Sequence, residues 1–376
     1  MLLSIERVLI MWRKGMYESG HNQGMKSQHL EIAWFAALCD DDYEQLGVVN
    51  ESLRSSWAHC ADIVRTADVR GFDSVLLPSG YELGIDAVAM ASALATVTSS
   101  IHLLTAVRIG ENWPPALARQ LATVAHLAPG RLNINIISSD LAGETLESSP
   151  RYQRTAEAMD ILRDLLDGRP SHSDGDFYSF DVVPPRIATG PRPPLYFGGL
   201  SPAARDVAAR YADVYLMWPD TMENVAEIIR DMRERAASYG RELRFGYRVH
   251  VVVRETEAAA RAAANYLVAA LDAEQGNAIR SRSLDAGSVG VARQSELREG
   301  ADDDGYAEAN LWTGIGRARS GCGAALVGSP AQILDKIEAY RELGIEAFIF
   351  SGYPHLEECE RFADLVLSQL THAPLY

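Results

Sequence analysis

The sequence predicts an α/β protein whose strands close into a (β/α)8 barrel with insertions. Eight short apolar stretches have the composition of buried parallel strands, and stretches with helical spacing separate nearly all of them. Eight such units favour a closed barrel over an open, doubly wound sheet. A doubly wound sheet should also carry a glycine fingerprint after its first strand, and this chain has none.

The expected strands alternate with helices along the chain. The strands span residues 30–38, 74–77, 101–107, 131–137, 194–197, 213–216, 244–253 and 346–350. The helices span residues 51–70, 85–98, a segment opening at 114, 150–167, 202–211, 222–238, about 256–271, 330–343 and 355–370. Local signals agree with these bounds, because Gly71 stands at the C-cap of the first helix and Pro114-Pro115 opens the third.

Two stretches interrupt the alternation. Residues 168–193 are rich in Gly, Pro, Ser and aromatic side chains, which suggests a hairpin insertion. Residues 272–325 are rich in Gly, Ser, Arg and Asp, and we expect a long lid-like loop there, before the last βα unit. Residues 1–28 are expected to be an arm that is disordered or not native, and residues 29–376 a single domain.

The composition excludes some classes of binding partner. The net charge of −16 argues against nucleic-acid and anionic-membrane binding, although local arginines can still bind a small anion. No stretch approaches the roughly 18 apolar residues of a membrane span. The four cysteines, Cys39, Cys60, Cys322 and Cys359, show no CxxC spacing, which fits a reduced, cytoplasmic protein.

The strand at 244–253 carries two unusual residues. Its period of two places Arg248 and His250 on the same face. Burying both without partners would cost roughly several kcal/mol. The strand therefore lies at a solvated edge, or the pair belongs to a site. Counting strands makes it the seventh of a closed barrel, which favours the site.

Polar and aromatic side chains follow the predicted strands, where barrel enzymes place their chemistry. They include Cys39, Ser79, Arg108, Asn112, Trp113, Ser138, Ser139, Asp140, Trp218, Ser351 and Tyr353. The set lacks the paired acids of a glycosidase and the clustered ligands of a metal site, so it favours a flat, polar, phosphorylated ligand. Gly198-Gly199-Leu200-Ser201 opens the helix at 202 and suits a phosphate; a glycine turn with Ser201 as N-cap is the alternative.

Several motifs carry a resemblance to a known family. They are Pro194-Leu-Tyr-Phe-Gly-Gly, Asp213-Val-Tyr-Leu-Met-Trp218, Arg244-Phe-Gly-Tyr-Arg-Val-His-Val-Val-Val-Arg-Glu255, Asn310-Leu-Trp-Thr-Gly-Ile-Gly, Arg319, Ala325-Leu-Val-Gly328 and Ser351-Gly-Tyr-Pro-His-Leu-Glu-Glu358. Over about residues 30–371 the chain resembles the bacterial-luciferase-like flavin monooxygenases. Within that superfamily it is most similar to the alkanesulfonate monooxygenases.

The resemblance implies a TIM barrel that uses reduced FMN from a separate NAD(P)H-dependent flavin reductase, with O2 as co-substrate. It also implies a homo-oligomer, either a dimer or a tetramer. The matching active-site residues are Arg248, His250, Arg319, Tyr353 and Trp218. The flavin is expected at Thr105, Ser138, Tyr152, Gly198, Gly199 and Ser201, with its phosphate near Ser201 and the Arg151-Tyr152 pair.

Three departures from the family pattern bear on the substrate. Cys39 replaces the histidine that usually ends the first strand, Leu83 replaces a cysteine after the second, and Ser138-Ser139-Asp140 replaces Thr-Gly-Gly. The expected function is oxygenation of a small organic substrate, possibly an alkanesulfonate, giving an aldehyde and sulfite. The alternatives are a non-sulfonate substrate, a deazaflavin-dependent oxidoreductase, or a flavin-binding protein without catalysis. Cys39 is expected to be a small packed residue rather than a nucleophile.

Overall fold

A computed structural model describes residues 29–80, 84–144, 146–187, 190–281 and 287–376. The N-terminal arm expected at 1–28, and Leu83, lie outside the described residues. None of the described helices is long and apolar enough to cross a membrane.

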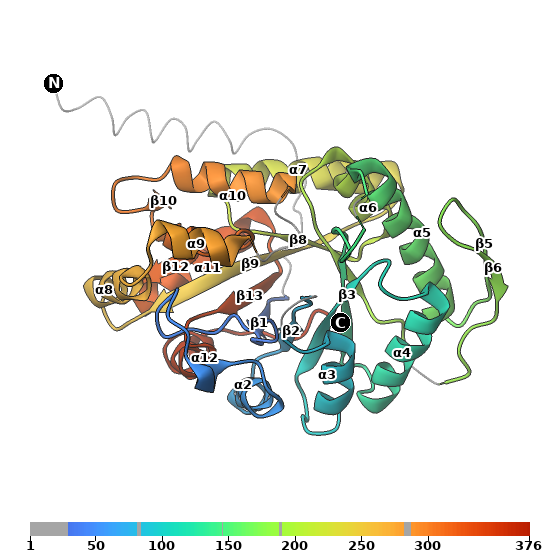
Figure 1. The fold of residues 1–376 in the computed structure, drawn as a ribbon, viewed down its shortest axis with the longest axis horizontal. Helices are drawn as coiled ribbons and strands as arrows, with labels where there is room; N and C mark the ends of the chain where they lie inside the picture. The colour runs from blue at the N-terminus through green and yellow to red at the C-terminus, as the bar shows by residue number, and fades with distance from the viewer. Residues whose placement is uncertain (1–28, 81–83, 145, 188–189, 282–286) are drawn as a thin grey trace, which may run out of the picture.

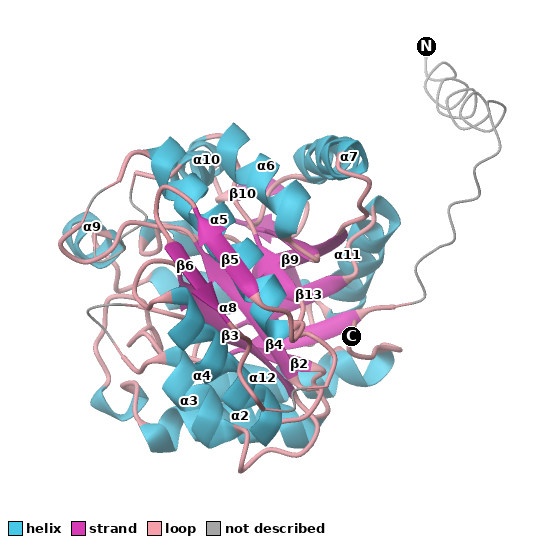
Figure 2. Ribbon diagram, turned by 90° about the vertical axis from the view of Figure 1, so that its right-hand side faces the viewer, coloured by secondary structure: helices cyan, strands magenta, loops and turns pink. Residues whose placement is uncertain are grey.

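The predicted barrel is confirmed. Its eight strands are β1 (Glu31–Phe35), β2 (Ser74–Leu77), β3 (His102–Arg108), β4 (Leu132–Ile137), β7 (Leu195–Phe197), β8 (Val214–Met217), β9 (Arg244–Val253) and β13 (Ala347–Ser351). Each pairs in parallel with the next, and β13 pairs in parallel with β1, which closes the barrel. Helices surround this sheet (Figure 1 and Figure 2).

The helices between the strands follow the predicted pattern. They are α2 (Trp57–Arg70), α3 (Ala87–Leu94), α4 (Pro114–Leu127), α5 (Ser148–Leu166), α6 (Pro202–Tyr211), α7 (Met222–Ser238), α8 (Glu257–Val268), α11 (Pro330–Leu343) and α12 (His355–Leu365). Short 3-10 turns occur at η1 (Glu51–Leu53) and η3 (Leu367–Gln369). Gly71 caps α2 with a φ of 86°, the left-handed conformation that glycine adopts without steric cost.

The first insertion is the predicted hairpin. β5 (Ser171–Asp174) and β6 (Ser179–Val182) pair antiparallel and lie outside α5, away from the barrel (Figure 1). Arg169 and Arg192, at the two ends of this insertion, both form ion pairs with Asp167. The hairpin therefore does not contribute to the barrel interior.

The insertion expected at 272–325 is present before the last βα unit, but it is not an irregular loop. This segment contains α9 (Ala273–Arg280), α10 (Val289–Glu299), β10 (Tyr306–Glu308), β11 (Leu311–Trp312) and the 3-10 turn η2 (Gly314–Arg317). The helices are short and polar, so they lack an apolar period, and side-chain caps mark their starts instead. Asp272 forms a capping box with Gln275 at α9, and the Ser288 hydroxyl accepts from the Val291 amide at α10.

A further strand was missed. β12 (Ala325–Gly328) pairs in parallel with the second half of β9, from His250 to Val253. β9 is long because its first half pairs with β8 and its second half pairs with β12. The seventh strand therefore has neighbours along both of its sides, and the edge-strand alternative for Arg248 and His250 is excluded.

Alternation along the strands separates two apolar layers. The cluster inside the barrel includes Phe35, Leu104, Tyr196 and Ile349. On each strand, the residues that alternate with these point outward and pack against the helices. The amino-terminal end of the barrel is closed by the C-terminus. There the backbone amide of Leu375 donates to Glu31, a fully buried carboxyl group on β1.

Candidate active site

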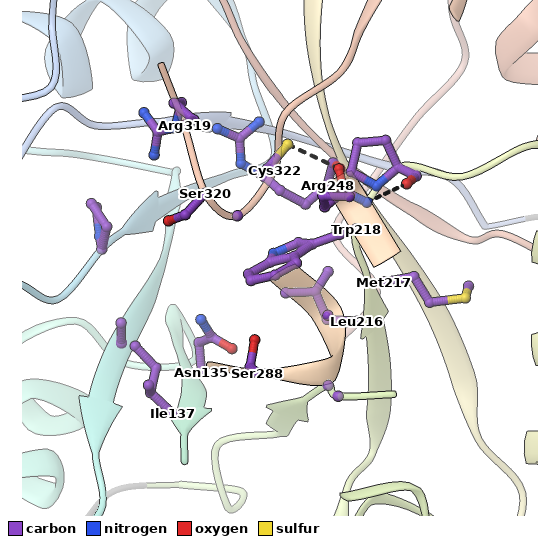
Figure 3. Close-up of a pocket in the computed structure, with 18 of the residues that line it drawn as sticks. Asn135, Ile137, Leu216, Met217, Trp218, Arg248, Ser288, Arg319, Ser320 and Cys322 are labelled. Carbon is purple, nitrogen blue, oxygen red and sulfur yellow. Dashed lines mark hydrogen bonds between the residues drawn. The ribbon is translucent and has the colours of Figure 1, made fainter. Parts of the chain in front are cut away.

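A cavity of about 420 Å³ opens at the carboxyl ends of the barrel strands. Its wall combines strand-end residues with residues of the 272–325 insertion. Figure 3 shows Asn135 and Ile137 from β4 on one side, and Arg248, Arg319, Ser320 and Cys322 on another, with Trp218 between them. Among the described residues, no group of His, Cys, Asp and Glu side chains has the arrangement of a metal site.

Arg248 reaches the cavity from the interior face of β9. Its guanidinium donates to the Ser351 hydroxyl at 2.8 Å and to the carbonyl oxygens of Val249 at 3.0 Å and Ile349 at 3.4 Å. It also lies 4.5 Å from the centre of the Phe35 ring, within cation–π range. All these partners are uncharged, so no carboxylate compensates the guanidinium. Burial lowers the pKa of Arg248, but an arginine side chain stays protonated in proteins, so a positive charge remains beside the cavity.

His250 shares that face, as predicted, but it is fully buried and does not line the cavity. Its Nδ1 is 2.6 Å from the Ser351 hydroxyl, and its ring stacks on Tyr353 at 5.2 Å. Burial, reinforced by the charge of Arg248, lowers the pKa of His250 well below its usual range. His250 is therefore neutral, and Ser351 connects it to Arg248.

Arg319 enters from the loop that follows η2. One of its terminal nitrogens donates to Asp41 Oδ2 at 2.8 Å and to the Tyr353 hydroxyl at 2.6 Å. Although burial opposes the charge, Tyr353 and Asp41 hold the pKa of Arg319 well above its usual value. Burial also raises the pKa of Tyr353, so its hydroxyl stays protonated and can still donate to a ligand.

Trp218 follows β8 and forms part of the cavity wall, as predicted. Its indole fits between two glycines of the insertion. A Cβ atom at Gly290 would lie 3.0 Å from the ring, and one at Gly321 would lie 3.1 Å from it. Glycine at both positions therefore lets the insertion approach the indole closely.

Helix α10 is held against the end of β8. Two nitrogens of Arg293 bond the two carboxylate oxygens of Asp220 at 2.7 and 2.8 Å. Beside this pair, the Gln294 side-chain amide donates to the Pro219 carbonyl and accepts from the Gly323 amide. A bidentate Arg–carboxylate pair is among the stronger polar contacts in proteins. Helix α10 is thus a fixed part of the cavity wall.

Most residues expected at the flavin lie on the cavity wall. Ser138, Tyr152, Gly198, Gly199 and Ser201 all line it. Ser201 caps α6 through its side chain, and the Ser138 hydroxyl accepts from Thr155 at 2.8 Å. The carboxylate noted as a departure, Asp140, accepts from Arg151 at 2.7 Å.

The two glycines also have a packing role. A Cβ atom at Gly198 would lie 2.0 Å from the Leu216 carbonyl oxygen, and Gly199 has a φ of 146°. Glycine is required at both positions whether or not a phosphate binds there. We therefore expect Gly198→Ala to lower the free energy of unfolding by about 2 kcal/mol through overpacking against β8.

Urea denaturation monitored by circular dichroism measures that change. Gly287→Ala is a suitable control, because a Cβ atom there meets nothing within 4 Å. Equal stability of Gly198→Ala and the wild type would contradict the packing role.

Thr105 requires a correction, because it does not line the cavity. On β3 the residues Leu104 and Ala106 face the barrel interior, whereas Leu103 and Val107 belong to the layer packed on the helices. Alternation places Thr105 in that outer layer, where its hydroxyl donates to the Leu103 carbonyl. The cavity residues of this strand are Ala106 and Arg108.

Cys39 lines the cavity, but its chemistry fits the expectation of a packed residue. Burial, assisted by the nearby Asp41 carboxylate, raises the pKa of the Cys39 thiol well above its usual value. A protonated thiol is a poor nucleophile.

Several cavity residues were missed by sequence reasoning. They are Asp41, Asp220, Arg293 and Gln294. Asp41 carried a weak signal, since it belongs to the acidic run that directly follows the first strand. The other three carried none, because their roles depend on α10 folding back onto β8.

Comparisons with known proteins agree with this fold. The family model for luciferase-like monooxygenases matches residues 31–347. The sulfoquinovose monooxygenase of Novosphingobium aromaticivorans is 59% identical over 360 residues, covering 93% of this chain and 99% of that protein. The sulfoquinovose monooxygenase of Agrobacterium fabrum is 49% identical over 346 residues, covering 90% of this chain and 89% of that protein.

Among solved structures, a riboflavin lyase with modified FMN and riboflavin superposes with a TM-score of 0.74 at 16% identity, covering 91% of each chain. This likeness independently supports the barrel fold. Because the family model spans most of the sequence and the two curated relatives align over nearly its whole length, the chain belongs to the luciferase-like monooxygenase family.

Proposed function

We propose that this protein is the oxygenase of a two-component system that uses reduced FMN and O2 to cleave the carbon–sulfur bond of a sulfonated sugar, sulfoquinovose. The observation that carries the proposal is the buried pair Arg248 and Arg319 with the Tyr353 hydroxyl, all facing one cavity. Guanidinium groups match the geometry of oxyanions. The substrate follows from the 59% identical relative, which is named as a sulfoquinovose monooxygenase.

The cavity fits a flavin. Its volume is within the usual range for small-molecule sites. The apolar side chains of Ile137 and Leu216 line the cavity and suit a flat aromatic ring. Ser138 and Tyr152 also line the cavity and can hold the polar edge or side chain of the cofactor. FMN is therefore the cofactor that we propose.

Each residue at the arginine end has a role in binding the substrate. Arg248 and Arg319 would bind the sulfonate oxygens, and Tyr353 would donate a hydrogen bond from its protonated hydroxyl. His250 would act through Ser351, which holds the guanidinium of Arg248 in place. His250 is thus a positioning residue, because it does not touch the cavity.

Trp218 and α10 would exclude water from the reacting atoms. Bound reduced FMN would supply the two electrons with which O2 is activated. Each turnover consumes one sulfonate, one O2 and one reduced FMN, and yields an aldehyde, hydrogen sulfite, oxidised FMN and water. The oxygen atom enters at the carbon that bears sulfur, and the carbon–sulfur bond breaks with its electron pair going to sulfite.

The proposal includes a partner and a compartment. Reduced FMN would come from a separate NAD(P)H-dependent flavin reductase, as membership of the luciferase-like monooxygenase family suggests. All four cysteines are free, which fits the reducing cytoplasm.

The test is sulfite release by the purified protein with FMN, a flavin reductase, NADH and O2. We expect sulfite from sulfoquinovose, and incorporation of one atom of ¹⁸O from ¹⁸O2 into the aldehyde product. Simple alkanesulfonates serve as comparison substrates. Absence of sulfite from every sulfonate would contradict the proposal, and turnover without O2 uptake would instead favour the deazaflavin alternative.

A further inference from the structure

We infer that Asp41 sets the charge of the substrate end of the cavity at +1, so that the site accepts a monoanionic sulfonate and rejects a dianion of the same shape. The inference rests on the proposed function, which places the anionic group of the substrate between Arg248 and Arg319. Asp41 would determine substrate selectivity, although it is not among the site residues expected from the sequence.

The cavity arginines differ in how their charge is compensated. Arg108 has Glu111 at 3.1 Å, Arg293 has Asp220 at 2.7 Å, and Arg319 has Asp41 at 2.8 Å. Arg248 contacts only uncharged groups, as described above. Of the described arginines that line the cavity, Arg248 is thus the one without a carboxylate partner.

The other titratable groups near Arg248 are uncharged. His250 is neutral because burial and Arg248 lower its pKa, and the hydroxyl of Tyr353 and the thiol of Cys322 stay protonated because burial raises their pKa values. Asp40, the remaining described carboxylate on the cavity wall, is paired with Arg54 at 3.2 Å. The charges of Arg248, Arg319 and Asp41 therefore add up to +1.

A second observation points to a ligand beside Asp41. Its Oδ2 is bound to Arg319, whereas its Oδ1 is buried and has no hydrogen-bond partner. An unpaired buried carboxylate oxygen is costly, and a hydroxyl group on a bound sugar would satisfy it. The same carboxylate can thus limit the charge of the anion and accept a hydrogen bond from the sugar.

In a buried site, the affinity for an anion depends on how well its charge matches the charge of the site. A monoanion beside a single positive charge leaves the buried site neutral. A dianion leaves one uncompensated negative charge away from water, next to the carboxylate of Asp41, and this is strongly unfavourable. Sulfonates and sulfate esters carry one negative charge, whereas a phosphate monoester carries nearly two above its second pKa of about 6.

The test compares glucose 6-sulfate with glucose 6-phosphate, two sugar esters of similar shape that differ by one charge. Their binding to the FMN-saturated wild-type protein is measured by calorimetry at pH 8. We expect the sulfate ester to bind at least about tenfold more tightly. This preference should shrink at pH 5.5, where the phosphate ester becomes largely monoanionic.

Asp41→Asn should remove the preference for the sulfate ester at pH 8, because it leaves Arg248 and Arg319 both uncompensated. We expect the ratio of the two dissociation constants to shift at least about tenfold toward the phosphate ester. Asp41→Glu keeps the charge and should keep the wild-type ratio. Asp62→Asn, at an exposed position on α2, removes one surface charge and should also leave the ratio unchanged.

Equal affinity of the wild type for the two esters at pH 8 would overturn the inference, even if Asp41→Asn does not fold. An unchanged ratio in a folded Asp41→Asn protein would overturn it as well. These outcomes are separate from the proposed function, because sulfite release from sulfoquinovose by the wild type is measured independently. The ratio of dissociation constants can shift as expected when the wild type forms no sulfite. Equally, the wild type can form sulfite when the ratio does not shift.

Discussion

Arg248→Ala is expected to lower kcat/KM for sulfite release by about 10³-fold, a loss of ~4 kcal/mol of transition-state stabilisation. The physical reason is that Arg248 carries the one uncompensated positive charge of the described cavity wall. Removing it leaves a buried sulfonate with Arg319 alone, and Arg319 is already paired with Asp41. The measurement is steady-state sulfite release with sulfoquinovose, reduced FMN and O2.

Two variants control this experiment. Arg248→Lys keeps the charge but loses the forked geometry, and should recover part of the lost activity. Arg244→Ala removes an arginine from the same strand at the opposite end of the barrel, where it lies 3.7 Å from Glu346, and should retain wild-type activity. A folded Arg248→Ala protein with a kcat/KM within threefold of wild type would show that Arg248 is not part of the reacting site.

Glu31→Gln should gain stability over the wild type as the pH rises. The free energy of unfolding of Glu31→Gln minus that of the wild type should increase by up to about 3 kcal/mol between pH 4.5 and pH 8. Burial at the closed end of the barrel, opposed in part by the Leu375 amide, raises the pKa of Glu31 to about 7. The raised pKa means that the folded protein binds the proton more tightly than the unfolded chain does. The contribution of Glu31 to stability is therefore full below pH 4.5 and falls as the pH rises to about 7.

Urea denaturation of the wild type and Glu31→Gln at pH 4.5, 6, 7 and 8 measures this effect. The contributions of the other titrating groups to the free energy of unfolding cancel in the difference between the two proteins, so this difference isolates the contribution of Glu31. Glu51→Gln, at an exposed position, should show no such pH dependence. A constant difference between Glu31→Gln and the wild type across this range would mean that folding does not raise the pKa of Glu31.

Much of the fold could be predicted because barrel units repeat a strong local pattern. Apolar strands and amphipathic helices alternate, so α7 (Met222–Ser238) and α11 (Pro330–Leu343) were predicted with their observed bounds. The 272–325 insertion was mispredicted because α9 and α10 are short and polar. Their stability depends on caps and on contacts such as Arg293 with Asp220, which join residues far apart in the sequence.

The candidate site divides in the same way. Arg248 and His250 could be placed on one face because a strand has a period of two, and the strand count then argued against an edge position. Thr105 was misplaced because the prediction depended on a family position and not on the alternation of β3. The sequence also gave no sign that Arg248 would line the cavity and His250 would not, since two residues on one strand face can differ in what covers them.

The sequence by itself determined the barrel, the order of its strands and the presence of two buried polar residues on the seventh strand. Those features follow from local periodicity, which neighbouring residues encode. Only the tertiary structure decided which charges meet, because Asp41, Arg248, Arg319 and Tyr353 come from distant parts of the chain and converge only when the barrel closes. The net charge of the cavity is a property of that convergence, and it is what the anion experiments with Asp41 and Arg248 measure.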